Sequence, residues 1–194
     1  MISVSEIARI VTAKLCVPTL PPIPKIIDWK KTITAILEIA ASKLEIKIET
    51  IIEIAQKHGF YYKTTGIWHK TNPMPRNMNL HFINSTEPWL YFVYGAKTGC
   101  FNNEGKALHD YIETSITPKR EKIHGAHPTQ KPLELIKYFI TVLSNEGDTV
   151  LDPFMGSGST VVAAKQNNRN GIGIDIELDY CELAMHRVLK ETKQ

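Results

Sequence analysis

The chain has 194 residues, of which 43% are hydrophobic and 22% are charged, as in ordinary folded globular proteins. Its length suits a single domain, and its formal net charge of +3 allows contact with nucleic acid without requiring it. No uncharged apolar run approaches the roughly 18–20 residues of a membrane span, so we expect no membrane partner. Three well-separated cysteines, Cys16, Cys100 and Cys181, indicate reduced thiols in a cytoplasmic protein and no bound metal.

The first two thirds of the chain contain patterns of both helix and strand. Apolar spacing predicts helices at residues 30–43 and 47–57, and aromatic runs predict strands at 60–68 and 89–94. Residues 97–126 are polar and weakly patterned, so we expect a long loop there.

The last third alternates between helix and strand. Pro132 is expected to begin a helix that continues through Leu143. After it we expect a strand at 148–151, a glycine turn at 152–158 and a helix at 159–165. A second strand at 171–176 and a final helix at 179–190 complete the pattern. A strand, a glycine turn, a helix and a second strand form a parallel βαβ unit, which makes the fold class α/β.

The glycine turn runs from Asp152 to Gly158 and has the sequence Asp-Pro-Phe-Met-Gly-Ser-Gly. It follows a predicted parallel strand, where open α/β sheets bind ligands, and its glycines let the backbone approach one closely. No Gly-Lys-Ser/Thr follows, which excludes a phosphate loop, and the third glycine of the dinucleotide motif is missing. The carboxylate of Asp152 favours a positively charged ligand such as S-adenosylmethionine.

A second acidic residue, Asp175, lies at the end of the next predicted strand. An acidic residue about 20 positions after such a turn typically binds ribose hydroxyls. Taken singly, Asp152 could cap a helix and Asp175 could stabilise a turn. Their spacing on adjacent strand ends favours a cofactor site.

A basic stretch without any acidic residue extends from Lys57 to Thr86 and contains several aromatic residues. Such a stretch can bind phosphates through its cations and stack bases on its rings. An exposed loop face beside a strand is an equally good interpretation.

Three motifs together resemble the amino-DNA methyltransferases, which methylate adenine N6 or cytosine N4. They are His-Pro-Thr-Gln-Lys-Pro at 127–132, Asp-Pro-Phe-Met-Gly-Ser-Gly at 152–158, and the segment Ile67–Asn77 with the strand after it. Their order is that of the permuted β group of the family, and the resemblance extends from about Gly59 to the C-terminus. It implies a Rossmann-like methyltransferase sheet with flanking helices, incomplete at the N-terminal side.

The resemblance also implies residue roles, with S-adenosylmethionine as cofactor and double-stranded DNA as partner. The cofactor would be bound by Thr129, Gln130, Lys131, Pro132, Asp152, Phe154, Gly156, Gly158 and Asp175. Free backbone donors after Pro132 could receive the cofactor carboxylate. Trp68 and His69 would lie near a flipped base. From their positive charge we predict that Lys63, Lys70 and Arg76, with the segment 119–122, form the surface that faces DNA. Trp68 would offer a stacking face to a flipped base, although it suits a sheet core almost as well.

The chain departs from the family at the catalytic motif, which is Asp/Asn/Ser-Pro-Pro followed by an aromatic residue. The corresponding residues are Leu20, Pro21, Pro22 and Ile23, or else these form only a proline turn and the motif is absent. Leucine accepts no hydrogen bond from the target amino group and isoleucine offers no ring. We therefore predict that this site is not functional in the chain alone.

The domain organisation follows from these matches. We expect one methyltransferase-like domain over residues 1–194, with a remodelled catalytic side (1–58), a target-base and DNA-reading segment (59–126) and a cofactor segment (127–194). Three interpretations stay open. The chain is a methyltransferase, an inactive remnant that binds DNA or a partner, or a fragment completed by a homodimer partner or a second chain.

Overall fold

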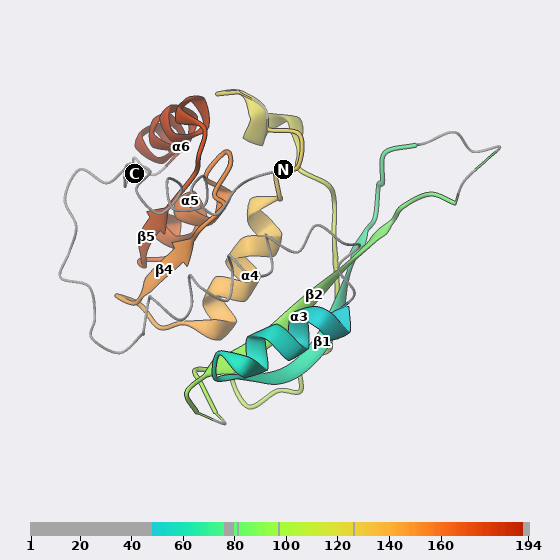
Figure 1. Ribbon diagram of the computed structural model, residues 1–194. Coiled ribbons are helices and arrows are strands. Elements are labelled where there is room, and N and C mark those ends of the chain that lie inside the picture. Colours follow the sequence, from blue (N-terminus) through green and yellow to red (C-terminus); the bar gives the residue numbers. More distant parts are fainter. Residues whose placement is uncertain (1–47, 76–79, 81, 97, 126, 192–194) are drawn as a thin grey trace. The chain divides into compact units, whose positions relative to one another are not determined.

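The computed structural model describes residues 48–75, 80, 82–96, 98–125 and 127–191 (Figure 1). The chain divides into two compact units, one comprising residues 1–64 and 90–99, the other 65–89 and 100–194. Two predicted features, the helix at 30–43 and the motif at 20–23, lie outside the described residues.

The first unit contains helix α3 (Ile48–Lys57) together with the start of strand β1 (Phe60–Lys70) and the end of strand β2 (Thr86–Tyr94). Gly59 ends the helix with φ of 86°, a backbone conformation that favours glycine. The ring of Phe60 packs against Phe92 and Tyr94, with ring centroids 6.5 and 5.0 Å apart. Aromatic packing therefore joins the two strands in this unit.

The second unit holds the rest of a three-stranded sheet with the order β2-β1-β3, in which strand β3 (Tyr111–Thr114) runs parallel to β1. The expectation of one long loop over 97–126 is wrong, because this segment contains β3 and a short 3₁₀-helix, η1 (Lys119–Lys122). Strand β3 contains one aliphatic side chain, Ile112, and lacks the glycine turn that follows β4, so no local pattern marks it. Its pairing with β1 supplies the backbone partners that make it a strand.

The predicted βαβ unit is present in the second unit. Strand β4 (Thr149–Asp152) is parallel to β5 (Asn170–Gly173), and helix α5 (Ser159–Gln166) connects them (Figure 1). Helix α4 (Leu133–Leu143) precedes this unit and helix α6 (Leu178–Glu191) follows it. The α/β fold class predicted from the sequence is confirmed.

Helix α4 contributes to two cores. Leu133 and Ile140 pack with Val162, Ala163 and Ala164 of α5, which are completely buried. Leu135 instead packs against Trp68 and Ile112, on strands β1 and β3. Within the second unit, helix α4 therefore fixes Trp68 of β1 and Ile112 of β3 against the βαβ unit that carries the glycine turn.

Among the residues that the structure describes, no helix combines the length and apolar character needed to cross a membrane. The same residues contain no group of three or more His, Cys, Asp or Glu placed to hold a metal ion.

Candidate functional site

Two turns lie at the carboxyl ends of the parallel strands β4 and β5, and each carries one aspartate. Asp152 ends β4 and pairs in register with Gly173, so Asp175 lies just beyond the end of the neighbouring strand. The backbone N–H of Gly156 donates a hydrogen bond to Oδ2 of Asp175 at 2.8 Å. The structure therefore brings the two predicted aspartates to one edge of the sheet and ties their turns together.

Each aspartate also stabilises its own turn. Oδ1 of Asp152 accepts a bond from the N–H of Phe154 at 3.0 Å, and Oδ1 of Asp175 accepts one from Glu177 at 3.0 Å. Asp152 does not cap helix α5, because the N-cap residue is Gly158. A carboxylate oxygen can accept two hydrogen bonds, so both side chains keep capacity for a ligand.

The surroundings of the two aspartates suit a ligand that is partly apolar. Phe154 is 59% exposed and Ile176 is 63% exposed, and each lies within two residues of one of the aspartates. Within the described part of the chain, neither aspartate forms an ion pair. Exposed apolar side chains beside carboxylates are suited to a ligand that combines an apolar ring with hydroxyl or cationic groups.

The glycines allow the first turn to pack closely. Gly158 has φ of 76°, and a Cβ there would lie 2.6 Å from the Cβ of Ala184 on α6. Gly156 has φ of 48°, and a Cβ there would lie 3.1 Å from Nε2 of His127. The imidazole of His127 thus packs on the glycine turn, which places the motif at 127–132 beside the motif at 152–158.

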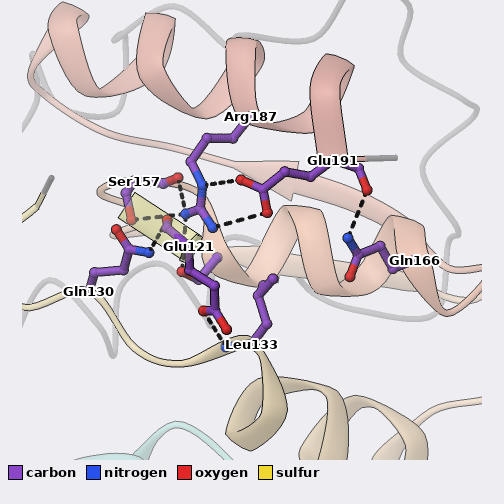
Figure 2. Close-up of polar contacts among 8 residues, drawn as sticks. Glu121, Gln130, Leu133, Ser157, Gln166, Arg187 and Glu191 are labelled. Atoms are coloured by element: carbon purple, nitrogen blue, oxygen red, sulfur yellow. Dashed lines mark hydrogen bonds and ion pairs between the residues drawn. The ribbon is translucent and has the colours of Figure 1, made fainter. Parts of the chain in front are cut away.

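The rest of the motif at 127–132 contacts the preceding segment. The side-chain amide of Gln130 donates to the carbonyl of Glu121 at 2.9 Å, and Oγ1 of Thr129 lies 3.2 Å from Nδ1 of His127. Pro132 is fully buried and is the N-cap residue of α4. The N–H of Leu133 donates to the carboxylate of Glu121 at 2.9 Å, so this donor is not free for a cofactor carboxylate, contrary to expectation (Figure 2).

Trp68 is a core residue. It is only 5% exposed, packs with Ile112 and Leu135, and donates its indole N–H to Oγ1 of Thr114 at 2.9 Å. The structure therefore favours the sheet-core interpretation of Trp68 over a free stacking face.

Its neighbour His69 lies on the opposite face of β1 and joins a polar group on the sheet. Nδ1 of His69 lies 2.8 Å from the carboxylate of Glu113, and the His69 ring stacks on Tyr111. The hydroxyl of Tyr111 donates to the same carboxylate at 2.8 Å. Hydrogen bonds from Tyr111 and then His69 lower the pKa of Glu113, and the bond to Glu113 raises the pKa of Tyr111.

The other predicted DNA residues lie in different parts of the chain. Lys63 belongs to the first compact unit, and Arg76 lies outside the described residues. In η1, Lys119, Arg120 and Lys122 are exposed but Glu121 is buried. The segment 119–122 is therefore a 3₁₀-helix whose acidic residue holds the start of α4.

Lys70 and Lys131 share one carboxylate, that of Glu87. Nζ of Lys70 lies 2.7 Å from Oε1 of Glu87, and Nζ of Lys131 bonds Oε2. Both ammonium groups lie 5.3 Å from the ring centroid of Trp68. Burial alone would raise the pKa of Glu87, but the hydrogen bonds from Lys131 and Lys70 outweigh it and lower the pKa. We call Lys70, Glu87 and Lys131 the lysine clamp.

A buried arginine supports the glycine turn from α6. The side chain of Arg187 has no exposed surface and donates to the carbonyl of Ser157 at 2.8 Å and to the hydroxyl of Ser159 at 3.2 Å (Figure 2). Its Nε donates to Glu191, one helical turn later, at 2.8 Å. Sequence reasoning missed Arg187, Glu87 and Glu121, because nothing local distinguishes a charged residue with tertiary partners from one that faces solvent.

Comparisons with known proteins agree with this geometry. A sequence model of the family described as DNA methylase matches residues 29–186. The chain is 39% identical over 147 residues to the type II methyltransferase M2.DpnII of Streptococcus pneumoniae, which covers 71% of this chain and 55% of that protein. The chain thus spans about half the length of the curated relatives it matches.

Solved structures show the same fold. The crystal structure of an M1.HpyAVI–SAM complex matches with a TM-score of 0.63 at 38% identity, covering 73% of this chain and 69% of that one. The cytosine-N4-specific PvuII DNA methyltransferase also matches with a TM-score of 0.63, covering 75% of this chain and 57% of that one, but at 16% identity it supports the fold alone. The resemblance found in the sequence is confirmed: the chain belongs to the DNA methylase family of N6 and N4 amino-methyltransferases and has its Rossmann-like α/β fold.

Proposed function

We propose that this chain binds S-adenosylmethionine beside Asp152 and Asp175 and takes part in methyl transfer to an exocyclic amino group of DNA. The observation that carries the proposal is the hydrogen bond from Gly156 to Asp175, which makes one site of two turns. The solved complex of the similar protein M1.HpyAVI with SAM supports the choice of cofactor.

The polar groups of the two turns fit this cofactor. Asp175 keeps lone pairs for ribose hydroxyls, and Asp152 supplies negative charge for an amino group or a sulfonium. The exposed side chains of Phe154 and Ile176 offer apolar contacts for an adenine ring. The absence of side chains at Gly156 and Gly158 lets His127 and Ala184 pack closely on the first turn, which holds its shape beside the two aspartates.

When bound, S-adenosylmethionine supplies an electrophilic methyl group for direct transfer to nitrogen. The contribution of this chain is then to hold and orient the cofactor against the target base. Double-stranded DNA is the proposed substrate, with adenine N6 favoured over cytosine N4.

We further propose that the chain alone transfers methyl groups poorly. Leu20 and Ile23 occupy the catalytic positions and provide neither an acceptor for the amino group nor an aromatic ring. Loss of one well-placed electrostatic partner costs on the order of 10²–10³ in rate. A homodimer partner or a second chain that supplies the motif would restore activity, and without one the protein acts as a DNA- or partner-binding remnant.

The test is transfer of labelled methyl groups from S-adenosylmethionine to duplex DNA of mixed sequence. It compares the wild-type chain, the chain with candidate partner chains, and the double variant Leu20→Asp, Ile23→Tyr. We expect little transfer by the wild type alone and a gain with a partner or with the double variant. The control adds Asp175→Ala to whichever sample shows increased methyl transfer. This substitution removes the proposed ribose acceptor and should abolish the increase.

Two outcomes contradict the proposal. Rapid transfer by the unmodified chain would show that Leu20 and Ile23 do not occupy the catalytic position. If calorimetry detects no binding of S-adenosylmethionine or its demethylated product by the folded wild-type chain, the proposed cofactor site is wrong.

A further inference from the structure

The lysine clamp lines a cavity of about 350 Å³. Besides the three clamp residues, its lining includes Trp68, Asn84, Lys122, Thr129 and Gln130. None of the residues at the two acidic turns lines it in the described part of the chain, so it is separate from those turns. Thr129, Gln130 and Lys131, which the resemblance assigns to the cofactor, do line it.

The charge of this cavity favours an anion. Lys70, Lys122 and Lys131 line it, and Glu87 is the one acidic residue among the described lining residues, which leaves an excess of two positive charges. The side chain of Lys70 is only 13% exposed, so the lysine is largely buried. Charges in such an environment interact more strongly than charges at an open surface.

The clamp also holds its ammonium groups ready for a ligand. Among the residues that the structure describes, each ammonium uses one of its three donors on Glu87, and both groups lie at the same 5.3 Å distance from the Trp68 ring. Two lysines that share a carboxylate are thus fixed as a pair with donors to spare.

We propose that this cavity is a phosphate site, in which Lys70 and Lys131 bind one backbone phosphate of DNA while Glu87 positions them. The inference rests on the proposed function, since it names the part of the DNA substrate that this chain binds. A phosphate is favoured because the exposed cations of η1, Lys119, Arg120 and Lys122, adjoin the cavity through Lys122 and suit a polyanion.

The first experiment measures binding of a short labelled duplex at several salt concentrations, without cofactor. Lys70→Gln and Lys131→Gln should each weaken binding and reduce the slope of log affinity against log salt by about one. Glu87→Gln should strengthen binding, because it removes the carboxylate that competes for the same ammonium groups. The control Lys106→Gln, whose lysine pairs with the exposed Glu104, should change neither quantity.

A phosphate site predicts that the lysine substitutions weaken DNA binding and that Glu87→Gln strengthens it, whereas a purely structural clamp predicts no such opposite effects. If all three clamp substitutions weaken DNA binding, or if none does, the proposal is overturned. Charge-retaining Lys70→Arg and Lys131→Arg should keep the salt slope of the wild type, and loss of the slope in them would also overturn it.

A second measurement uses the unmodified chain, in case a substitution prevents folding. Lysine acetylation is mapped by mass spectrometry with duplex DNA, with S-adenosylmethionine, and with neither. Lys131, whose side chain is 40% exposed, should be protected by DNA and not by the cofactor, while Lys106 stays reactive throughout. Protection by the cofactor alone would assign the cavity to its carboxylate and overturn the proposal.

The DNA-binding and acetylation experiments test the phosphate site separately from the proposed cofactor site. The DNA measurements need no cofactor, so a chain that fails to bind S-adenosylmethionine contradicts the proposed function and still reports on the phosphate site.

Discussion

The carboxylate of Asp175 and the backbone nitrogen of Gly156 are joined by a hydrogen bond of 2.8 Å across 19 residues of sequence. The bond links the turn after β4 to the turn after β5, so one side chain has two tasks. It orders the glycine turn, and it offers its remaining lone pairs to a ligand.

Replacement of this side chain should affect the ligand more than the fold. We expect Asp175→Ala to weaken binding of S-adenosylmethionine about tenfold or more, because hydrogen bonds to a charged group contribute roughly 1.5–3 kcal/mol. Calorimetry measures the affinity, and Asp179→Ala, an exposed acidic residue in the first turn of α6, is the control. An unchanged dissociation constant for Asp175→Ala would show that this carboxylate serves the turn alone.

Alanine substitutions at Gly147 and Gly158 should distinguish the cost of backbone strain from the cost of a steric clash, because both glycines have a positive φ but only one has a close neighbour. Gly147 has φ of 83° and a Cβ added there would meet nothing within 4 Å, whereas a Cβ at Gly158 would meet Ala184. Gly147→Ala should lower the free energy of unfolding by about 1–2 kcal/mol through backbone strain. Gly158→Ala should cost about 1–3 kcal/mol more, because overpacking is added. Urea unfolding of both variants provides the comparison, and equal losses would contradict the close contact with α6.

Arg187 should be needed for stability. Arg187→Met removes the donors to Ser157 and Ser159 and leaves Glu191 without its cation, and breaking such a buried pair typically costs about 3–5 kcal/mol. Denaturant unfolding measures this loss. Lys190→Met, on an exposed position of the same helix, is the control and should change stability little. A similar small effect at both positions would show that the arginine network is dispensable.

The lysine clamp predicts a dependence of stability on pH. The folded-state pKa of Glu87 is lowered from its ordinary 4.5, so the clamp stabilises the fold above that value and the contribution is lost as pH falls through the lower folded-state pKa. Glu87→Gln should therefore reduce stability at neutral pH and flatten its decline in acid. Urea midpoints measured across this range test the prediction, with the exposed Glu104→Gln as control. Parallel curves for wild type and Glu87→Gln would contradict it.

Much of the second unit could be predicted from the sequence. The helix after Pro132, the βαβ unit and the two acidic turns each have a local signal, namely a proline start, apolar spacing, or glycines beside a strand. Strand β3 had none, because it contains a single aliphatic residue beside no glycine turn, and its backbone partners come from pairing with β1. The position of Trp68 was ambiguous for the same reason: a tryptophan in a strand looks alike whether its ring is packed or exposed.

The polar residues that organise the site were the hardest to predict. Glu121 lies between three basic residues of η1 and would ordinarily be assigned to the surface, yet it holds the first N–H of α4. Glu87 and Arg187 likewise owe their contacts to partners 44 and 30 residues away. Such roles follow from tertiary contacts that no local pattern encodes.

The two glycines of β5, Gly171 and Gly173, are required by close packing around the strand. A Cβ at Gly171 would lie 2.8 Å from Cγ1 of Val161, and one at Gly173 would lie 2.1 Å from Sδ of Met155. These two glycines set how closely α5 and the first turn approach the strand, whether or not a ligand is bound. A relative that no longer binds the cofactor should therefore still keep them, and the loss would be visible instead at the carboxylate that follows, Asp175.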